Sequence, residues 1–118
     1  MADKKELKDY TEGQVFQIIR KIVAQKLGEM YGIEDFKPDS DLETEFDADS
    51  LDKIEIEMEI ERKFNVDAYG INEKFKTIND IMDYLRKNYG FKDSPKTVVV
   101  FIMTARQNQS VITQQKKR

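Results

Sequence analysis

Apolar and acidic residues alternate along residues 54–61, a pattern that at first favours a β-strand. A strand would leave two nearby apolar residues, Leu51 and Phe64, without a role. On a helix that turns about 100° per residue, all six apolar positions instead fall into two stripes on opposite sides. One stripe is Ile56, Ile60 and Phe64, and the other is Leu51, Ile54 and Met58. The pattern therefore predicts a helix over residues 50–65, with one stripe buried and the other facing outward or toward a partner.

Helical spacing marks two further segments, each with a start and a stop signal. Thr11 and Gln14 form a capping-box pattern ahead of an apolar series, and Gly28 follows that series as a stop. Thr77 has the position of an N-cap for the last helix, and Gly90 ends it. The apolar positions are Val15, Ile18, Ile19, Ile22, Val23 and Leu27 in the first helix and Ile78, Ile81, Met82, Leu85 and Tyr89 in the last.

Turn chemistry replaces periodicity between the first helix and Ser50. Residues 29–49 contain Gly, Pro and scattered acids, and they predict a long loop, which is often functional in a small domain. We expect its anchors to the core to be Met30, Ile33, Phe36, Leu42 and Phe46. Residues 68–76 predict a short helical turn or an irregular bridge, with Ile71 and Phe75 packing inward. The fold class is therefore an all-α four-helix bundle with a long first loop and a short third helix.

The chain has 118 residues and contains neither cysteine nor histidine. A disulfide framework, a thiolate metal site and a Ser-His-Asp hydrolase are therefore excluded, and we expect no metal site and no enzymatic activity. No apolar run approaches membrane-spanning length, and the N-terminus has no apolar signal core. We expect a cytoplasmic monomer without a membrane partner.

Charge is distributed unevenly along the chain. Residues 1–91 hold 14 Lys/Arg against 22 Asp/Glu, whereas residues 92–118 hold six Lys/Arg and one Asp/Glu. The acidic body argues against a nucleic-acid partner and for partners with basic protein surfaces. We expect residues 1–10 to be a flexible leader, residues 11–91 to be the domain and residues 92–118 to be a basic tail. Residues 97–104 carry a strong β signature, which leaves open whether the tail adds a packing element, pairs chains or is foreign to the domain.

Ser50 lies between two aspartates at the predicted start of the acidic helix. A serine there is most often an N-cap, but Asp49 can cap equally well and leave Ser50 free at the first helical position. Since the chain has no histidine, Ser50 has no base of its own, and another protein must activate it if it reacts. A helix N-terminus suits a phosphate ester, because its backbone N–H groups and its dipole attract an anion.

The run around Ser50 reads Phe46-Asp47-Ala48-Asp49-Ser50-Leu51-Asp52, with Ile54, Ile56, Met58 and Phe64 behind it. In register with the order of the helices, this run resembles the acyl carrier proteins, and the resemblance covers residues 12–89. It implies an acyl-carrier-like bundle in which Ser50 holds 4′-phosphopantetheine, moved from coenzyme A by a separate phosphopantetheinyl transferase with Mg²⁺. Such a carrier catalyses nothing itself. It presents acyl groups as thioesters to acyl-transferring and acyl-modifying enzymes of fatty-acid, polyketide or related lipid biosynthesis.

The resemblance also gives each stripe of the acidic helix a role. Partner enzymes with basic patches would recognise the outward side, where acids steer the encounter and apolar side chains supply contact. Its members are Asp49, Leu51, Asp52, Ile54, Glu55, Met58 and Glu59. The inward stripe of Ile56, Ile60 and Phe64 would line the acyl pocket.

Several positions depart from the family pattern. Asp47 stands where the family usually has Gly, and Glu57 and Glu59 stand where apolar or small residues are common. The bridge reads Tyr69-Gly70-Ile71-Asn72 instead of an acidic third-helix pattern. Together with the tail, these departures suggest a specialised carrier rather than the general fatty-acid carrier.

Proteins of other classes compete with the carrier hypothesis. An unmodified acidic helical adaptor would bind its partner through Leu51, Ile54 and Met58 and would need no chemistry at Ser50. A calcium loop beginning at Asp39 or residue 41 lacks the Gly and Glu that an EF-hand requires at its sixth and twelfth positions. A self-contained enzyme would have neither His nor Cys to work with.

Overall fold

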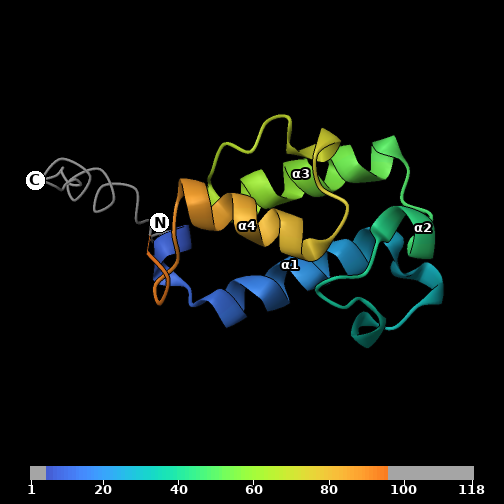
Figure 1. Cartoon of the computed structure of the whole chain (residues 1–118), viewed down its shortest axis with the longest axis horizontal. Helices are drawn as coiled ribbons and strands as arrows, with labels where there is room; N and C mark the ends of the chain where they lie inside the picture. The colour runs from blue at the N-terminus through green and yellow to red at the C-terminus, as the bar shows by residue number, and fades with distance from the viewer. Residues whose placement is uncertain (1–4, 96–118) are drawn as a thin grey trace, which may run out of the picture.

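The computed structural model describes residues 5–95, and four α-helices form the body of this part of the chain (Figure 1). They are α1 (Glu12–Leu27), α2 (Leu42–Phe46), α3 (Ser50–Phe64) and α4 (Ile78–Asn88). Short 3-10 turns lie between or before them: η1 (Leu7–Asp9), η2 (Gly28–Met30), η3 (Ile33–Asp35) and η4 (Ile71–Glu73). Helix α1 packs against both α3 and α4, and η4 packs against α3. The prediction of an all-α bundle is confirmed.

Side-chain caps place the starts of two long helices where the sequence predicted them. The Thr11 hydroxyl accepts a hydrogen bond from Gln14 N at 3.2 Å, and Gln14 Oε1 accepts one from Thr11 N at 2.9 Å. Thr77 and Asp80 form the same reciprocal pair at the start of α4, at 3.0 and 3.1 Å. Gly90 follows α4 with a φ of 79°, a left-handed conformation that glycine adopts without strain.

One hydrophobic core joins the helices, the loop and the bridge. The inward stripe of α3, Ile56, Ile60 and Phe64, is fully buried in it, as the periodicity predicted. The other large, fully buried side chains are Ile19, Phe36, Leu42, Phe75, Ile78, Ile81, Leu85 and Phe91.

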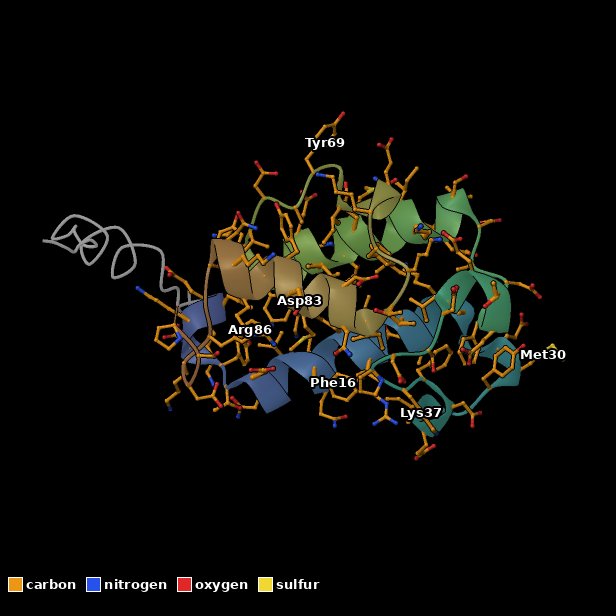
Figure 2. The ribbon with its side chains drawn as sticks, in the orientation of Figure 1. Phe16, Met30, Lys37, Tyr69, Asp83 and Arg86 are labelled. Atoms are coloured by element: carbon orange, nitrogen blue, oxygen red, sulfur yellow. The ribbon has the colours of Figure 1, made fainter. Side chains whose placement is uncertain are left out.

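The loop between α1 and α3 differs from its prediction in two ways. It contains the five-residue helix α2, which is too short for periodicity to reveal. Three of the predicted anchors, Phe36, Leu42 and Phe46, are buried, but Met30 and Ile33 are exposed, and the prediction that they anchor the loop is wrong. Met30 projects from one end of the molecule with 87% of its surface exposed (Figure 2).

An aromatic cluster explains why Met30 and Ile33 are not needed as anchors. Tyr31 meets the ring of Phe46 edge-on at 4.8 Å between centroids, and Phe36 stacks on Phe46 at 4.2 Å. Aromatic rings bury large areas and gain further from such geometry. The cluster therefore closes this end of the core, and the residues on either side of Tyr31 remain in solvent.

The bridge between α3 and α4 contains the predicted helical turn, η4, and both predicted anchors, Ile71 and Phe75, are buried. Polar groups on its neighbours hold the rest of the bridge. Glu61 Oε2 on α3 accepts a hydrogen bond from Ala68 N at 2.8 Å, and the Tyr84 hydroxyl on α4 donates to Asp67 O at 3.2 Å. Burial raises the pKa of Tyr84, so this hydroxyl stays protonated and can donate.

Residues beyond the predicted domain boundaries also pack on the bundle. Within residues 5–10, for which a flexible leader was predicted, Leu7 is buried in η1. At the other end, Lys92 N, one residue past the predicted domain, donates to Tyr10 O at 2.7 Å, and Phe91, the last residue of that domain, is buried. The predicted β signature of residues 97–104 lies outside the described residues. None of the helices between residues 5 and 95 is both long and apolar enough to cross a membrane.

Candidate functional site

Ser50 occupies the first position of α3, and its neighbour Asp49 is the N-cap. Asp49 Oδ1 accepts a hydrogen bond from Asp52 N at 2.8 Å, and Asp52 Oδ2 accepts one from Asp49 N at 3.1 Å. Ser50 is exposed, and its hydroxyl has no hydrogen-bond partner among residues 5–95. The structure thus resolves the two alternatives for the serine: capping is done by the aspartates, and Ser50 Oγ is accessible.

The backbone before Ser50 explains one departure from the family pattern. Asp47 ends α2 with a φ of 58° and a ψ of 33°, a left-handed conformation. Glycine adopts this region most readily, and Asp is among the few other residues that tolerate it. The next residue, Ala48, is buried, and its N–H donates to Leu42 O at 3.0 Å. This tight turn directs the chain from α2 into α3 and leaves Ser50 at the surface.

A surface hollow of about 390 Å³ lies beside Ser50. Its lining residues come from α2, the turn before α3, α3 and η4, and all but Ala48 have polar or charged side chains: Glu43, Ala48, Asp49, Ser50, Lys53, Asn72 and Glu73. Lys53 Nζ pairs with Glu43 Oε2 at 2.6 Å and lies 5.2 Å from the centre of the Phe75 ring. The hollow therefore presents one cation, several acids and an amide next to an accessible hydroxyl.

Two functional candidates in this region, Glu57 and Asn72, were noted in the sequence only as departures from the family pattern. Glu57 is buried, and its Oε1 accepts hydrogen bonds from both Asn72 N at 2.9 Å and Asn72 Nδ2 at 2.8 Å. The spacing of Ser50, Lys53 and Glu57 was the signal that could have found Glu57, whereas no signal in the sequence pointed to Asn72. Residues three and four apart share a helix face, so these three side chains form one row.

The outward stripe of α3 has the exposure that the sequence predicted. Leu51, Ile54 and Met58 are 60%, 39% and 56% exposed. Large apolar side chains grouped in this way on a surface are typical of an interaction site.

The acids predicted to surround this stripe are not equivalent. Asp49 and Asp52 are engaged in the helix cap, and Glu59 pairs with Arg62 at 2.6 Å. Glu55 is exposed. All four remain at or near the surface, where their charges contribute to an acidic field around the stripe.

Several acids of the loop that raised the calcium hypothesis have structural partners. Asp41 caps α2, where its Oδ1 accepts hydrogen bonds from Glu43 N at 3.0 Å and Thr44 N at 3.1 Å. The hydrogen bond from Thr44 lowers the pKa of the Asp41 carboxyl, although burial opposes it. In the stretch from residue 5 to residue 95, no group of three or more Asp and Glu side chains is arranged to hold a metal ion.

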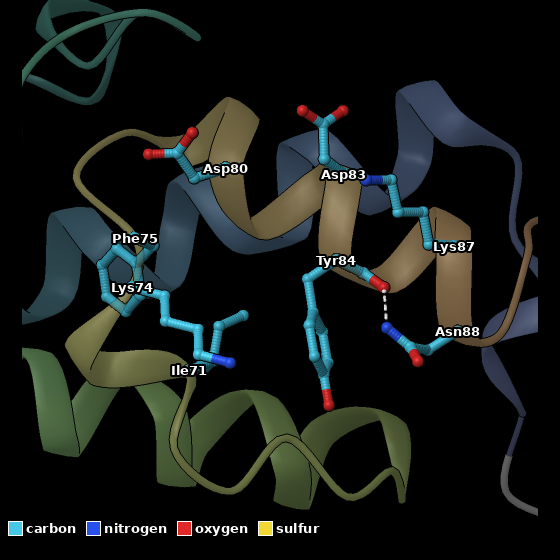
Figure 3. A pocket seen from close by; sticks show the side chains of 8 residues that line it. All are labelled: Ile71, Lys74, Phe75, Asp80, Asp83, Tyr84, Lys87 and Asn88. Carbon is cyan, nitrogen blue, oxygen red and sulfur yellow. Dashed lines mark hydrogen bonds between the residues drawn. The ribbon is translucent and has the colours of Figure 1, made fainter.

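A second hollow, of about 270 Å³, lies between the bridge and α4 (Figure 3). Lys74 and Lys87 line it together with Asp80 and Asp83, so its charges are mixed. In Figure 3, Tyr84 extends from α4 past this hollow toward the bridge. None of the predicted site residues lines it.

Comparison with known proteins places the chain among carriers of a prosthetic group. Residues 17–85 match the family model described as a phosphopantetheine attachment site. A protein of Desulforapulum autotrophicum named acyl carrier protein is 39% identical over 70 residues, which cover 58% of this chain and 90% of that protein. Acyl carrier proteins of Chlorobium phaeobacteroides and Helicobacter hepaticus are 33% and 31% identical, over 65% and 62% of this chain and 97% and 95% of theirs. No solved structure gives a significant match.

Proposed function

The chain belongs to the acyl carrier protein family, and from this premise we propose that Ser50 is the residue that carries its 4′-phosphopantetheine. The family consists of carriers and not of enzymes, and its cofactor is phosphopantetheine. The single observation that supports Ser50 is its place in the fold. It is an exposed serine at the first position of α3, with its hydroxyl unpaired among the described residues and with Asp49 taking the capping role.

The surroundings of Ser50 fit the phosphodiester that attachment would create. On attachment, the Ser50 Oγ–P bond forms, the phosphoanhydride bond of coenzyme A breaks, adenosine 3′,5′-bisphosphate leaves, and the hydroxyl proton passes to a base of the transferase. When bound, the group supplies a thiol on which acyl groups are held as thioesters. The N–H groups of the first turn of α3 and the nearby ammonium of Lys53 favour the negative charge of the ester.

We propose that partner enzymes recognise the outward side of α3. Exposed Leu51, Ile54 and Met58 supply apolar contact, and the surrounding acids supply electrostatic steering toward basic surfaces. The acids are Asp49, Asp52, Glu55 and Glu59. The expected partners are a phosphopantetheinyl transferase and acyl-transferring or acyl-modifying enzymes, with fatty-acid, polyketide or related lipid synthesis as the pathway. A cytoplasmic location and a monomeric state remain predictions.

Ile56, Ile60 and Phe64 remain the proposed lining of an acyl pocket. All three are buried on the inward side of α3, where an alkyl chain would meet only apolar atoms once it had entered. In this structure they are members of the hydrophobic core and pack against its other side chains. Their role therefore depends on whether an acyl chain can reach them from Ser50.

The attachment is tested by intact mass. The full chain is incubated with coenzyme A, Mg²⁺ and a broad-specificity phosphopantetheinyl transferase, beside Ser50→Ala and the matched control Ser94→Ala. We expect the wild type and Ser94→Ala to gain one phosphopantetheine and Ser50→Ala to gain none. No gain by folded, initially unmodified wild-type protein would overturn the proposal and favour the unmodified adaptor, which needs no chemistry at Ser50.

A further inference from the structure

Two charged side chains of α3 are buried, although burial of a charge is costly. Among residues 5–95, Lys53 and Glu57 are the buried ionisable residues, and both lie on the side of α3 that packs toward η4. Such side chains are rarely buried unless they are paired. Both are paired here, Lys53 with Glu43 and Glu57 with Asn72. Their position relative to Ser50 indicates what they do.

Ser50, Lys53, Glu57 and Ile60 follow one another along a single row of α3. At a rise of about 1.5 Å per residue, Glu57 lies about 10 Å along the helix from Ser50, and Ile60 lies about 15 Å along it. A chain that leaves Ser50 and runs inward along this row passes Lys53 first and Glu57 second. It reaches the apolar residues Ile60 and Phe64 only after both.

Asn72, on η4, packs against this row of α3. It lines the hollow beside Ser50, and it donates two hydrogen bonds to the same oxygen of Glu57, one from its backbone and one from its side chain. One end of the Glu57–Asn72 contact is therefore at the hollow and the other is at the buried face of α3. The contact joins α3 to η4, so a chain that followed this row of α3 into the core would have to part the two residues.

Separating Glu57 from Asn72 would be unfavourable for an alkyl chain in particular. The carboxylate of Glu57 would remain buried but would lose both hydrogen bonds, and methylene groups cannot replace them. A hydroxyl or amide group that leaves water for the hollow can replace its hydrogen bonds to water, because Asp49, Asn72 and Glu73 offer hydrogen-bond partners there.

We propose that Glu57 and Asn72 are specificity-determining residues that close the passage from Ser50 to the core. On this basis the hollow holds the polar pantetheine arm with short or hydroxylated acyl groups, and long alkyl chains are kept out of the interior. Ile60 and Phe64, the residues of the proposed acyl pocket that lie beyond Glu57, become accessible to an acyl chain only when the Glu57–Asn72 contact is removed. This inference rests on the proposed attachment at Ser50.

The test compares acyl groups of different length and polarity on the same protein. The full chain is loaded from acetyl-, 3-hydroxybutyryl- and octanoyl-coenzyme A, and intact mass verifies each form. The two measurements are the thermal unfolding midpoint and the rate at which hydroxylamine cleaves the thioester. In the wild type we expect the octanoyl and acetyl forms to unfold within about 1 °C of each other and to be cleaved at similar rates.

The opening variant is the double substitution Glu57→Val with Asn72→Ala. Removing both side chains at once leaves only the backbone N–H of residue 72 without its partner, and because that residue is partly exposed, water can replace Glu57 there. We expect its octanoyl form to unfold at least about 4 °C above its acetyl form, because the chain now buries apolar surface. Hydroxylamine should cleave that octanoyl thioester about threefold more slowly than the acetyl thioester, since the core now shields it.

Two single variants control for structural effects. Glu57→Gln keeps an oxygen that can accept from Asn72 and should behave as the wild type. Glu61→Val removes a different hydrogen bond between α3 and the bridge, the one to Ala68 N, beyond the proposed passage. It should lower stability equally for every acyl form, without any dependence on chain length.

Each result decides between the possibilities. If the loaded wild type is stabilised by octanoyl as the family's pocket would predict, the passage is open and the inference is wrong. It is also wrong if the double variant shows no dependence on chain length. If the wild type cannot be loaded at all, the attachment at Ser50 fails first, and intact mass distinguishes that outcome from the other two.

Discussion

Asp49 and Ser50 are neighbours with different tasks at the start of α3. Asp49 and Asp52 satisfy each other's backbone N–H groups, so the helix start does not depend on the serine. Ser50 Oγ is left accessible at the positive end of the helix dipole. Modification of Ser50 by another protein therefore leaves the hydrogen bonds that cap the helix in place.

This division of tasks predicts different stability effects for two adjacent alanine substitutions. Asp49→Ala should lower the free energy of unfolding by about 1 kcal/mol, the usual cost of losing a cap. Ser50→Ala should change it by less than about 0.5 kcal/mol, as expected for a surface residue without partners. Urea unfolding of the unmodified proteins measures both. Equal losses would mean that the serine contributes to the cap in solution.

Helix α3 has three faces with different surroundings. Its inward stripe is part of the core, its outward stripe is exposed, and the row of Ser50, Lys53 and Glu57 faces α2 and η4. The alternation of apolar and acidic residues follows from this arrangement. Glu57 and Glu61 are hydrogen-bond acceptors for the bridge, whereas Glu55 is exposed.

The outward stripe predicts a loss of partner recognition without a loss of stability. Met58→Ala removes exposed apolar contact area, so we expect kcat/KM of the phosphopantetheinyl transferase for this carrier to fall about tenfold. The free energy of unfolding should change by less than about 0.5 kcal/mol, since Met58 is largely exposed. The measurement is the initial rate of loading at several carrier concentrations.

Gln25→Ala, at an exposed position of α1, is the matched control for Met58→Ala. It should leave the loading rate unchanged. A transferase that loads the Met58 variant as fast as the wild type would show that this part of α3 is not its docking surface.

The segments at the two ends of the described chain contact each other and pack on the same end of the bundle. Glu12 N donates to Asp93 Oδ1 at 2.8 Å, and the Arg86 guanidinium pairs with Glu12 at 2.5 Å and lies 5.7 Å from the centre of the Phe91 ring. The hydrogen bond to Glu12 raises the pKa of Arg86, so the guanidinium stays charged and keeps its ion pair. Leu7 and Phe91 are both buried in the core, one before α1 and one after α4.

Because Leu7 is buried, we predict that it contributes to stability although it lies outside the domain predicted from the sequence. Leu7→Ala removes a buried side chain and should lower the free energy of unfolding by about 2–4 kcal/mol. Lys8→Ala, its exposed neighbour, should change it by less than about 0.5 kcal/mol. Thermal or urea unfolding of the full chain measures the difference. A small effect of Leu7→Ala would mean that the turn before α1 contributes little in solution.

Much of the fold and part of the site could be predicted because the signals are local. The caps of α1 and α4 and the two stripes of α3 follow from spacing along one helix, and the structure agrees with each. Helix α2 was missed because five residues give no periodicity. The anchoring role given to Met30 and Ile33 was wrong, because hydrophobicity alone does not tell which residues of a loop meet the core.

The sequence by itself therefore determined the three long helices, the family and the serine at a helix start. Each depends on residues close together in the chain, and propensity, capping and periodicity act at that range. Only the tertiary structure decided what Glu57 does, since its partner Asn72 is 15 residues away along the chain and belongs to a segment without periodicity. Whether a buried carboxylate blocks a passage or lines a surface depends on which distant backbone packs over it, and packing between separate segments settles that.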